Sequence, residues 1–180
     1  MRRCESGDKF PGVIPAKAGI QLAPRGAKAT RAFADAMVGR LLDTLERSEY
    51  AGNTIVVLWS DHGMHMGEKE NFEKFTLWER STHVPLMIKA PGVTRPGTRV
   101  DQPVSLMDMY PTLAELAGFD VPPHVDGTSL VPLMKNPAAT HGPVVTSYRI
   151  AANPAWHLGP VFEPQVGHAV RTMNYRYIYY

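Results

Sequence analysis

The hydrophobic positions that follow residue 30 predict an amphipathic helix. Apolar side chains recur there at helical spacing and charged residues occupy the other faces; the apolar set is Phe33, Met37, Val38, Leu41, Leu42 and Leu45. Thr30 is a suitable N-cap, because its hydroxyl can accept a hydrogen bond from a free backbone N–H of the first turn. We therefore expect a one-faced helix from about Thr30 to about Ser48.

A continuous apolar run follows this helix and predicts a buried strand. Gly52 and Asn53 supply a turn, and the sequence TIVVLWS (54–60) then shows no alternation of polar and apolar positions. Continuous apolarity is typical of a strand covered on both faces, as in a parallel sheet flanked by helices. A helix, a short turn and a buried strand indicate an α/β fold with a mainly parallel sheet.

Further elements are expected downstream. They are a strand closed by Pro-Gly (83–92), a helix (105–118), a turn with a short amphipathic segment (125–137), a strand (144–149), and two strands that turn at Met173-Asn174 (168–180). The last two strands predict a C-terminal antiparallel hairpin beside the α/β layout.

The expected helix at 105–118 has recognisable positions. Pro111 belongs in its first turns or kinks it, and Gly118 is a suitable C-terminal stop. The side chains predicted to face inward are Leu106, Met109, Leu113 and Leu116.

Residues 1–28 differ from the rest of the chain. They mix Gly, Pro and Lys without helical or strand periodicity, so we expect an irregular or disordered segment. Within it, VIPAKAGIQ (13–21) resembles the peptide encoded by certain dispersed bacterial DNA repeats. Two interpretations stay open, a spurious translation of such a repeat and an ordinary flexible N-terminal arm.

Composition and charge narrow the classes of function. The 180 residues are 44% hydrophobic and 20% charged, as is usual for a globular domain, and a net charge of +2 without a Lys/Arg block argues against nucleic acid as a partner. No apolar stretch approaches the roughly 20 residues that span a membrane, and no apolar segment follows the basic N-terminus as in a signal peptide. Cys4 is the single cysteine, which excludes an internal disulfide and a Cys-based zinc site.

Chemically functional side chains stand directly behind the predicted strand. Asp61 and His62 follow it, and ligands gather at the carboxyl ends of strands in open α/β sheets. A carboxylate and an imidazole can bind a divalent cation such as Ca²⁺, Mg²⁺ or Zn²⁺, and Gly63 would let the backbone turn sharply after them. On spacing alone, a metal site and a polar turn that closes the strand both remain open.

A longer series of motifs carries a resemblance to a known family. The motifs are SDHG (60–63), MGE (66–68), Lys74 ahead of Trp78-Glu79, and VPL (84–86). Together they resemble the late metal-binding segment of the sulfatase family, in the alkaline-phosphatase-like superfamily. The flanking helix, strand and loop sequences agree from about residue 29 onward, and HAVRTMNYRYIYY is similar to a hairpin of iduronate-2-sulfatase-like members.

The resemblance implies a fold and a set of domain limits. It implies a partial alkaline-phosphatase-like sandwich, in which residues 29–180 are the C-terminal part of a sulfatase catalytic domain. That part is expected to be truncated at both ends.

The resemblance also implies roles for named residues. Asp61 and His62 would be ligands of a divalent cation, usually Ca²⁺ with Mg²⁺ as the alternative. Lys74 would contact the sulfate group, which suits a compact ammonium. His168 is a weaker candidate for substrate contact, since a surface histidine is the simpler interpretation. The substrate would be a sulfated small molecule or glycan, and full-length relatives are often exported.

The nucleophile expected in the family is missing from this sequence. Sulfatases use a formylglycine made from Cys or Ser in a Cys/Ser-x-Pro/Ala-x-Arg segment, and the sequence after Cys4 lacks both the Pro/Ala and the Arg. The early Asp-Asp metal ligands of the family are absent as well. Two ligands hold Ca²⁺ poorly, so we expect weak metal binding and no turnover by this chain alone, with the missing N-terminal half of the domain as a partner.

Two alternatives remain open. One is a fragment of a nucleotide phosphodiesterase or phosphonate hydrolase of the same superfamily, some of which also contain SDHGM. The other is a non-catalytic protein or pseudogene product. The segment from Lys74 to Glu79 and the strand that contains VPL favour the sulfatase.

Overall fold

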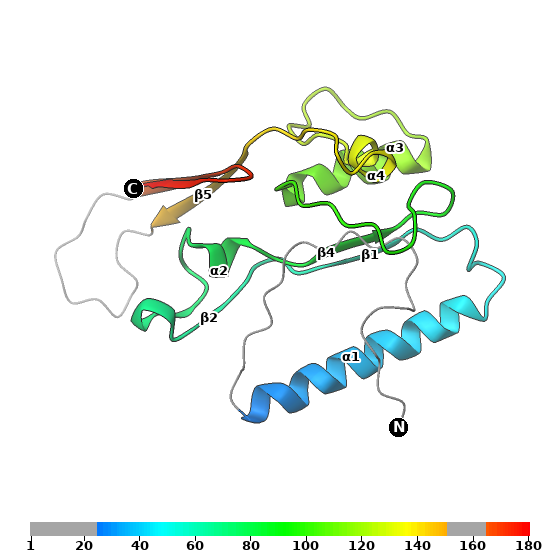
Figure 1. Cartoon of the computed structure of the whole chain (residues 1–180), viewed down its shortest axis with the longest axis horizontal. Coiled ribbons are helices and arrows are strands. Elements are labelled where there is room, and N and C mark those ends of the chain that lie inside the picture. The colour runs from blue at the N-terminus through cyan, green and yellow to red at the C-terminus, as the bar shows by residue number, and fades with distance from the viewer. Residues whose placement is uncertain (1–24, 151–164) are drawn as a thin grey trace.

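The computed structural model describes residues 25–150 and 165–180 (Figure 1). The elements are α1 (Arg25–Glu46), β1 (Val56–Trp59), β2 (His65–Met66), the 3₁₀ helix η1 (Glu68–Glu70), β3 (Phe72–Glu73), α2 (Glu79–Thr82), β4 (Leu86–Lys89), the 3₁₀ helix η2 (Leu106–Asp108), α3 (Met109–Ala117), α4 (Val131–Lys135), β5 (Val144–Ile150), β6 (Gln165–Arg171) and β7 (Arg176–Tyr179). Most of the predicted irregular segment 1–28 lies outside the described residues, and the predicted domain limits stay predictions.

The order of helices and strands confirms an α/β protein, but the predicted parallel pairing is wrong for the described strands. They form three antiparallel sheets, with the orders β1-β4, β2-β3 and β5-β6-β7. In the first sheet Trp59 pairs with Leu86, and the Ser60 N–H donates to the Pro85 carbonyl just beyond it at 3.3 Å. Residues 60–85 therefore form a long connection that begins and ends at the same end of the β1–β4 pair. It contains only short elements and no crossover helix, which parallel pairing would require.

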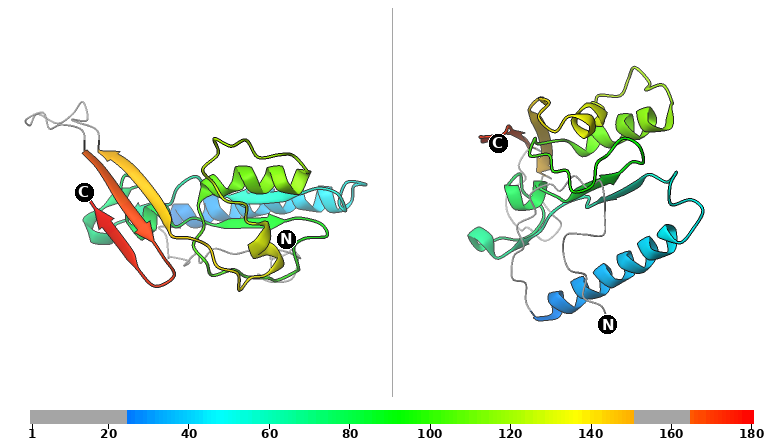
Figure 2. Two further views of the ribbon diagram at one scale, coloured as in Figure 1. Left: turned by 90° about the horizontal axis from the view of Figure 1, so that it is seen from above. Right: turned by 45° about the vertical axis from the view of Figure 1, so that its right-hand side comes forward.

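The hydrophobic core lies where β4 meets the helices that follow it. Its buried members are Leu86, Ile88, Val100, Leu130, Val131, Leu133 and Met134, with Val57, Met109 and Leu116 packed against them. Only one side of the β1–β4 pair is covered in this way, as Figure 2 shows. Leu58 and Trp59 remain exposed, with 48% of Trp59 accessible, so the prediction of a strand buried on both faces is wrong within the described chain.

Helix α3 is close to its prediction. It ends at Gly118, whose φ of 76° is the left-handed conformation that favours glycine at a helix terminus. Pro111 lies in the first turn, where its missing N–H does no harm. The predicted inward face is partly wrong, because Leu113 is exposed while Thr112 is fully buried.

Buried polar groups join α3 to the chain before α4. The Asp108 carboxylate accepts hydrogen bonds from the backbone N–H groups of Ser105 at 2.7 Å and Thr128 at 2.8 Å. The Thr112 hydroxyl donates to the Asp108 carbonyl at 2.5 Å and accepts from the Leu130 N–H at 2.8 Å. These bonds satisfy polar groups that would otherwise be costly to bury.

Helix α1 extends beneath the β1–β4 pair in Figure 1, and its apolar face is only partly covered by the described residues. Phe33 is 66% exposed and Leu41 is 71% exposed. The helix also begins at Arg25, so Thr30 is not its N-cap, whereas its end at Glu46 is close to the prediction. Among the helices that the structure describes, none combines the length and apolarity of a membrane span.

The predicted C-terminal strands are confirmed. Strands β6 and β7 form a hairpin that turns over Thr172–Tyr175, with the Thr172 N–H donating to the Tyr175 carbonyl at 2.9 Å. Strand β5 adds to the other edge of β6 along its whole length. The resulting sheet stands beside α2, and this places it next to the segment that carries Lys74 (Figure 1).

Candidate functional site

Asp61 and His62 follow β1 directly, at the carboxyl end of the strand, as predicted. The backbone there is held by local hydrogen bonds: the Ser60 hydroxyl donates to the His62 carbonyl at 2.8 Å, and the His62 N–H donates to Asp61 Oδ1 at 3.0 Å. The Asp61 side chain is exposed and His62 is half-buried. The strand end therefore fixes two potential ligand side chains next to each other.

Gly63 is required here by a close approach between two backbone segments. Its N–H donates to the Ser81 carbonyl at 2.8 Å, and a Cβ on Gly63 would lie within 1.8 Å of the Arg80 carbonyl oxygen. The sequence analysis explained Gly63 by a sharp backbone turn, whereas in the structure a side chain at this position would clash with the Arg80 carbonyl. The contact joins the end of β1 to α2, and so fixes Asp61 relative to the chain that follows Lys74.

His62 and Lys74 contact each other directly. The Lys74 Nζ lies 2.7 Å from His62 Nε2, and His62 Nδ1 lies 2.8 Å from the Gly63 carbonyl oxygen. Asp61 Oδ2 lies 3.4 Å from the same Nε2. The three side chains to which the sequence assigns cation and sulfate contact are therefore brought together at one point.

A buried polar network lies behind Lys74. His65 is only 1% exposed; its Nε2 lies 2.7 Å from the Thr76 hydroxyl, which lies 3.0 Å from the Ser81 hydroxyl. The His65 ring also meets Trp78 edge to face, with centroids 5.4 Å apart. These contacts fix the chain on both sides of Lys74, because they connect β2 to the start of α2.

A second anchor connects this segment to the C-terminal hairpin. Glu79 accepts from Arg176 through Nε at 2.8 Å and Nη2 at 2.7 Å, and Arg171 Nε lies 3.5 Å from the same carboxylate oxygen. Arg176 also donates to the Leu77 carbonyl at 2.8 Å. The fork of Arg176 thus binds both the side chain of Glu79 and the backbone two residues before it. Glu79 therefore connects the segment after Lys74 to the C-terminal hairpin.

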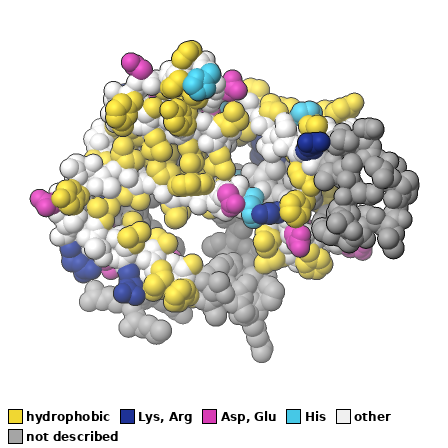
Figure 3. Space-filling view, turned by 180° about the vertical axis from the view of Figure 1, so that it is seen from behind, with side chains coloured by type: hydrophobic (Ala, Val, Ile, Leu, Met, Phe, Trp, Pro, Cys, Tyr) yellow, Lys and Arg dark blue, Asp and Glu magenta, His cyan; other side chains and the backbone are white. Residues whose placement is uncertain are grey.

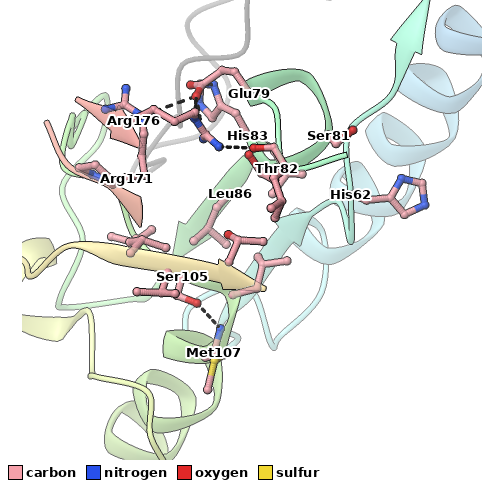
Figure 4. Close-up of a pocket in the computed structure, with 18 of the residues that line it drawn as sticks. His62, Glu79, Ser81, Thr82, His83, Leu86, Ser105, Met107, Arg171 and Arg176 are labelled. Atoms are coloured by element: carbon pink, nitrogen blue, oxygen red, sulfur yellow. Dashed lines mark hydrogen bonds and ion pairs between the residues drawn. The ribbon is translucent and has the colours of Figure 1, made fainter. Parts of the chain in front are cut away.

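These groups surround a cavity of about 600 Å³. Asp61, His62 and Lys74 line it together with Glu79, Arg171 and Arg176, and apolar residues such as Met107 and Val145 contribute the rest. Figure 4 shows the Glu79 and Arg176 group on one side of the cavity and His62 on the other. On the face shown in Figure 3, acidic, histidine and basic side chains lie next to one another, which suits a polar ligand with a negative group.

His168 is not among the residues that line this cavity. It is exposed on β6, and its Nδ1 lies 2.9 Å from the Ser147 hydroxyl. Ser147 itself lines the cavity, so His168 is one hydrogen bond removed from it.

The donor atoms of Asp61 and His62 suit one side of a cation site. Their separation of 3.4 Å matches the roughly 3.3 Å expected between neighbouring ligands that each lie about 2.3–2.4 Å from a cation. Within the described residues, however, no three His, Cys, Asp or Glu side chains converge on one point. Asp61 and His62 alone could therefore provide only part of a coordination shell.

Sequence reasoning missed the residues that position this site. His65 carries no local signal of burial, and Arg171 and Arg176 are separated from Glu79 by more than ninety residues. The buried network and the anchor depend on three-dimensional contacts that periodicity does not report. The available signal was the presence of two arginines, Arg171 and Arg176, on the predicted C-terminal hairpin, since such side chains often pair with a carboxylate elsewhere in the chain.

Solved structures of similar fold were found. A phosphonate monoester hydrolase from Silicibacter pomeroyi aligns with a TM-score of 0.71 and 27% identity, over 81% of this chain and 30% of that protein. A protein solved in complex with its substrate D-glucosamine-2-N,6-O-disulfate aligns with a TM-score of 0.62 and 28% identity, over 80% of this chain and 28% of that protein. The fold is therefore that of part of an alkaline-phosphatase-like domain.

Sequence comparison is more specific. The family model described as Sulfatase matches residues 28–119, and a protein described as a sulfatase from Formosa agariphila is 40% identical over 149 residues. That alignment covers 82% of this chain and 26% of the relative, so the chain spans about a quarter of the relative's length. The chain belongs to the sulfatase family.

Proposed function

We propose that this chain is the C-terminal part of a sulfatase catalytic domain and contributes one wall of a site that hydrolyses sulfate esters. The observation that carries the proposal is the meeting of Asp61, His62 and Lys74 at a cavity of about 600 Å³. A cation site beside an ammonium is the arrangement that binding a sulfate group calls for, because both neutralise negative charge on its oxygens.

Each residue has a distinct proposed role. Asp61 and His62 would hold the divalent cation, Ca²⁺ or Mg²⁺, which supplies charge neutralisation at the sulfate when bound. Lys74 would donate hydrogen bonds to a sulfate oxygen. Glu79 and His65 keep the segment that carries Lys74 in place through the contacts described above.

The chain alone is proposed to be catalytically incomplete. The described residues bring two proposed ligands, Asp61 and His62, together, and Ca²⁺ takes six to eight oxygen ligands. The sequence after Cys4 does not supply the formylglycine segment of the family. We propose that the nucleophile and the remaining ligands come from a polypeptide equivalent to the N-terminal portion of the domain.

The proposed substrate is a sulfated small molecule or glycan. Support comes from the similar fold of the protein bound to a glucosamine disulfate and from the size of the cavity, which suits one or two sugar units. The similarity of residues 168–180 to the hairpin of iduronate-2-sulfatase-like members favours that group within the family.

A second candidate function has one specific observation in its favour. The phosphonate monoester hydrolase from Silicibacter pomeroyi aligns with the higher TM-score of the two structures reported above. Phosphonate and sulfate esters both present tetrahedral oxyanions, so an ammonium and a cation suit either one. The sulfatase family match makes sulfate esters the first choice.

The test uses the full chain and a chromogenic aryl sulfate in the presence of Ca²⁺. The chain alone should give no turnover, and a mixture with a polypeptide that carries the part of the Formosa agariphila relative before its 149 matched residues should hydrolyse the ester. An aryl phosphonate in the same mixture separates the two candidates. Saturable hydrolysis by the isolated chain that Lys74→Ala abolishes would contradict the proposed incompleteness.

A further inference from the structure

The proton positions on His62 follow from its two partners. The Gly63 carbonyl oxygen can only accept, so His62 Nδ1, at 2.8 Å from it, carries the proton. The Lys74 ammonium can only donate, so His62 Nε2, at 2.7 Å, receives its hydrogen bond through the lone pair. The imidazole is therefore neutral, and its one lone pair is already in use.

The neighbouring carboxylate gives this lone pair a second possible partner. Asp61 Oδ2 and His62 Nε2 lie 3.4 Å apart, and neither carries a hydrogen in this tautomer. They cannot hydrogen-bond to each other, yet their spacing suits two ligands of one cation. A cation bound there would need the same lone pair that Lys74 occupies.

Lys74 has little else to hold it in this position. Among the described residues it makes no ion pair within 4 Å, and its remaining contact places Nζ 5.8 Å from the Phe75 ring centroid. Loss of the bond to His62 would therefore leave the ammonium without a hydrogen-bonding partner in that part of the chain. Its side chain lines the same cavity as Asp61 and His62.

We propose that Lys74 and the divalent cation compete for the Nε2 lone pair of His62, and that cation binding releases the Lys74 ammonium for an anionic ligand. This inference rests on the proposed cation site. It predicts an order of events: the cation binds first, Lys74 leaves His62, and the sulfate group then meets both positive charges. Without a cation, one of the three N–H donors of Lys74 stays bonded to His62.

The test measures cation affinity, not catalysis. Mn²⁺ binding to the full chain is followed by its EPR signal, with Ca²⁺ as a competitor, for the wild type and for Lys74→Met. The variant keeps the side-chain length but removes the donor and the charge. It should bind Mn²⁺ about tenfold more tightly, because no hydrogen bond to His62 has to be broken.

Lys69→Met is the matched control. Lys69 lies in the same segment, with its Nζ 4.5 Å from the Trp78 ring centroid, and it has no hydrogen bond to His62. Its replacement removes a nearby positive charge and should change Mn²⁺ affinity less than twofold. A gain in Lys74→Met that His62→Ala then removes would tie the effect to the shared lone pair.

A measurement on the wild type protects the test against a variant that fails to fold. In nitrogen NMR, Ca²⁺ should shift His62 Nε2 and Lys74 Nζ along one saturation curve, while His62 Nδ1 stays nearly constant. Equal Mn²⁺ affinity in the wild type and Lys74→Met, or a Lys74 signal that ignores Ca²⁺, would overturn the competition but leave the cation site. Absence of Mn²⁺ binding to both proteins, even when the polypeptide that supplies the remaining ligands is added, would overturn the proposed cation site itself.

Discussion

The region around β4 and α4 is held together differently from the region around Lys74. The first is an apolar core in which Ile88 is 1% exposed and Leu133 is buried beside it. The second depends on directed polar contacts, among them the bonds from Arg176 to Glu79. The core therefore determines whether the chain folds, and the polar contacts determine where Lys74 is held.

This difference follows from what each region must do. Apolar burial contributes roughly 25 cal/mol per Å² and is not directional, so it stabilises without fixing side-chain positions finely. Hydrogen bonds contribute about 1 kcal/mol each and do fix positions. A binding site that also needs contact with water is therefore built from the second kind of interaction. Substitutions in the apolar core should therefore change the free energy of unfolding more than substitutions at the polar contacts around Lys74.

The largest expected effect lies in the core. Ile88→Ala should lower the free energy of unfolding by about 3 kcal/mol, through lost transfer energy and a residual cavity. Urea denaturation measures this change. Phe119→Ala is the control: Phe119 is exposed, so its replacement should change stability by about 0.5 kcal/mol or less. Equal effects of the two would mean that the core does not carry the stability.

Asp108 tests whether one polar group can matter as much as core packing. Asp108→Ala leaves the backbone N–H groups of Ser105 and Thr128 without acceptors, so a loss of about 2 kcal/mol is expected. Asp101, which is exposed and forms its ion pair with Arg99, provides the control. Asp101→Ala should cost about 0.5 kcal/mol or less by the same urea measurement.

Gly63→Ala tests the close contact between the end of β1 and α2, which connects the two regions. The added methyl group would meet the Arg80 carbonyl, so the strand end and α2 must separate, at a cost of about 1–2 kcal/mol. Hydrogen exchange should show the loss mainly at the Gly63 amide and around Ser81. Gly142→Ala, where no atom lies within 4 Å of the new group, should leave exchange unchanged. An effect of similar size at both positions would contradict the close approach.

The smallest expected effect on stability lies at the anchor. Glu79→Gln weakens its contacts with Arg171 and Arg176, but the pair is partly exposed, so the loss should be about 0.5–1 kcal/mol. Amide exchange in β7 should nevertheless quicken more than exchange in β4. Glu115→Gln on the exposed side of α3 is the control. Equal acceleration in both strands would show that Glu79 contributes no local restraint.

The sequence predicted the local elements better than their assembly. The C-terminal hairpin, the end of α3 at Gly118 and the place of Asp61 after β1 all follow from short-range signals, and the structure confirms them. The strand direction of β1 was predicted wrongly, because an apolar run reports burial and carries no information about pairing direction. Leu58 and Trp59 of β1 are exposed, so the apolar run at 54–60 predicted a more deeply buried strand than the described residues form.

The sequence predicted which residues of the candidate site lie together, but not the contacts that hold them; their chemical roles stay predictions. The resemblance to sulfatases named Asp61, His62 and Lys74, and these three meet in the structure. The contacts that hold them, such as His65 with Thr76, are recognisable only after folding because they join different segments. A role for Lys74 as the partner of His62 was also out of reach, since the 2.7 Å contact depends on both backbones.

The most direct test of the proposed role is a segment exchange. The 149 matched residues of the Formosa agariphila relative are replaced by the corresponding residues of this chain, and hydrolysis of an aryl sulfate is measured with Ca²⁺. The exchanged protein should hydrolyse the ester; Lys74→Ala should abolish the hydrolysis, and Lys89→Ala, which lies outside the cavity, should preserve it. A folded exchanged protein whose hydrolysis is unchanged by Lys74→Ala would contradict the role of Lys74 in the site.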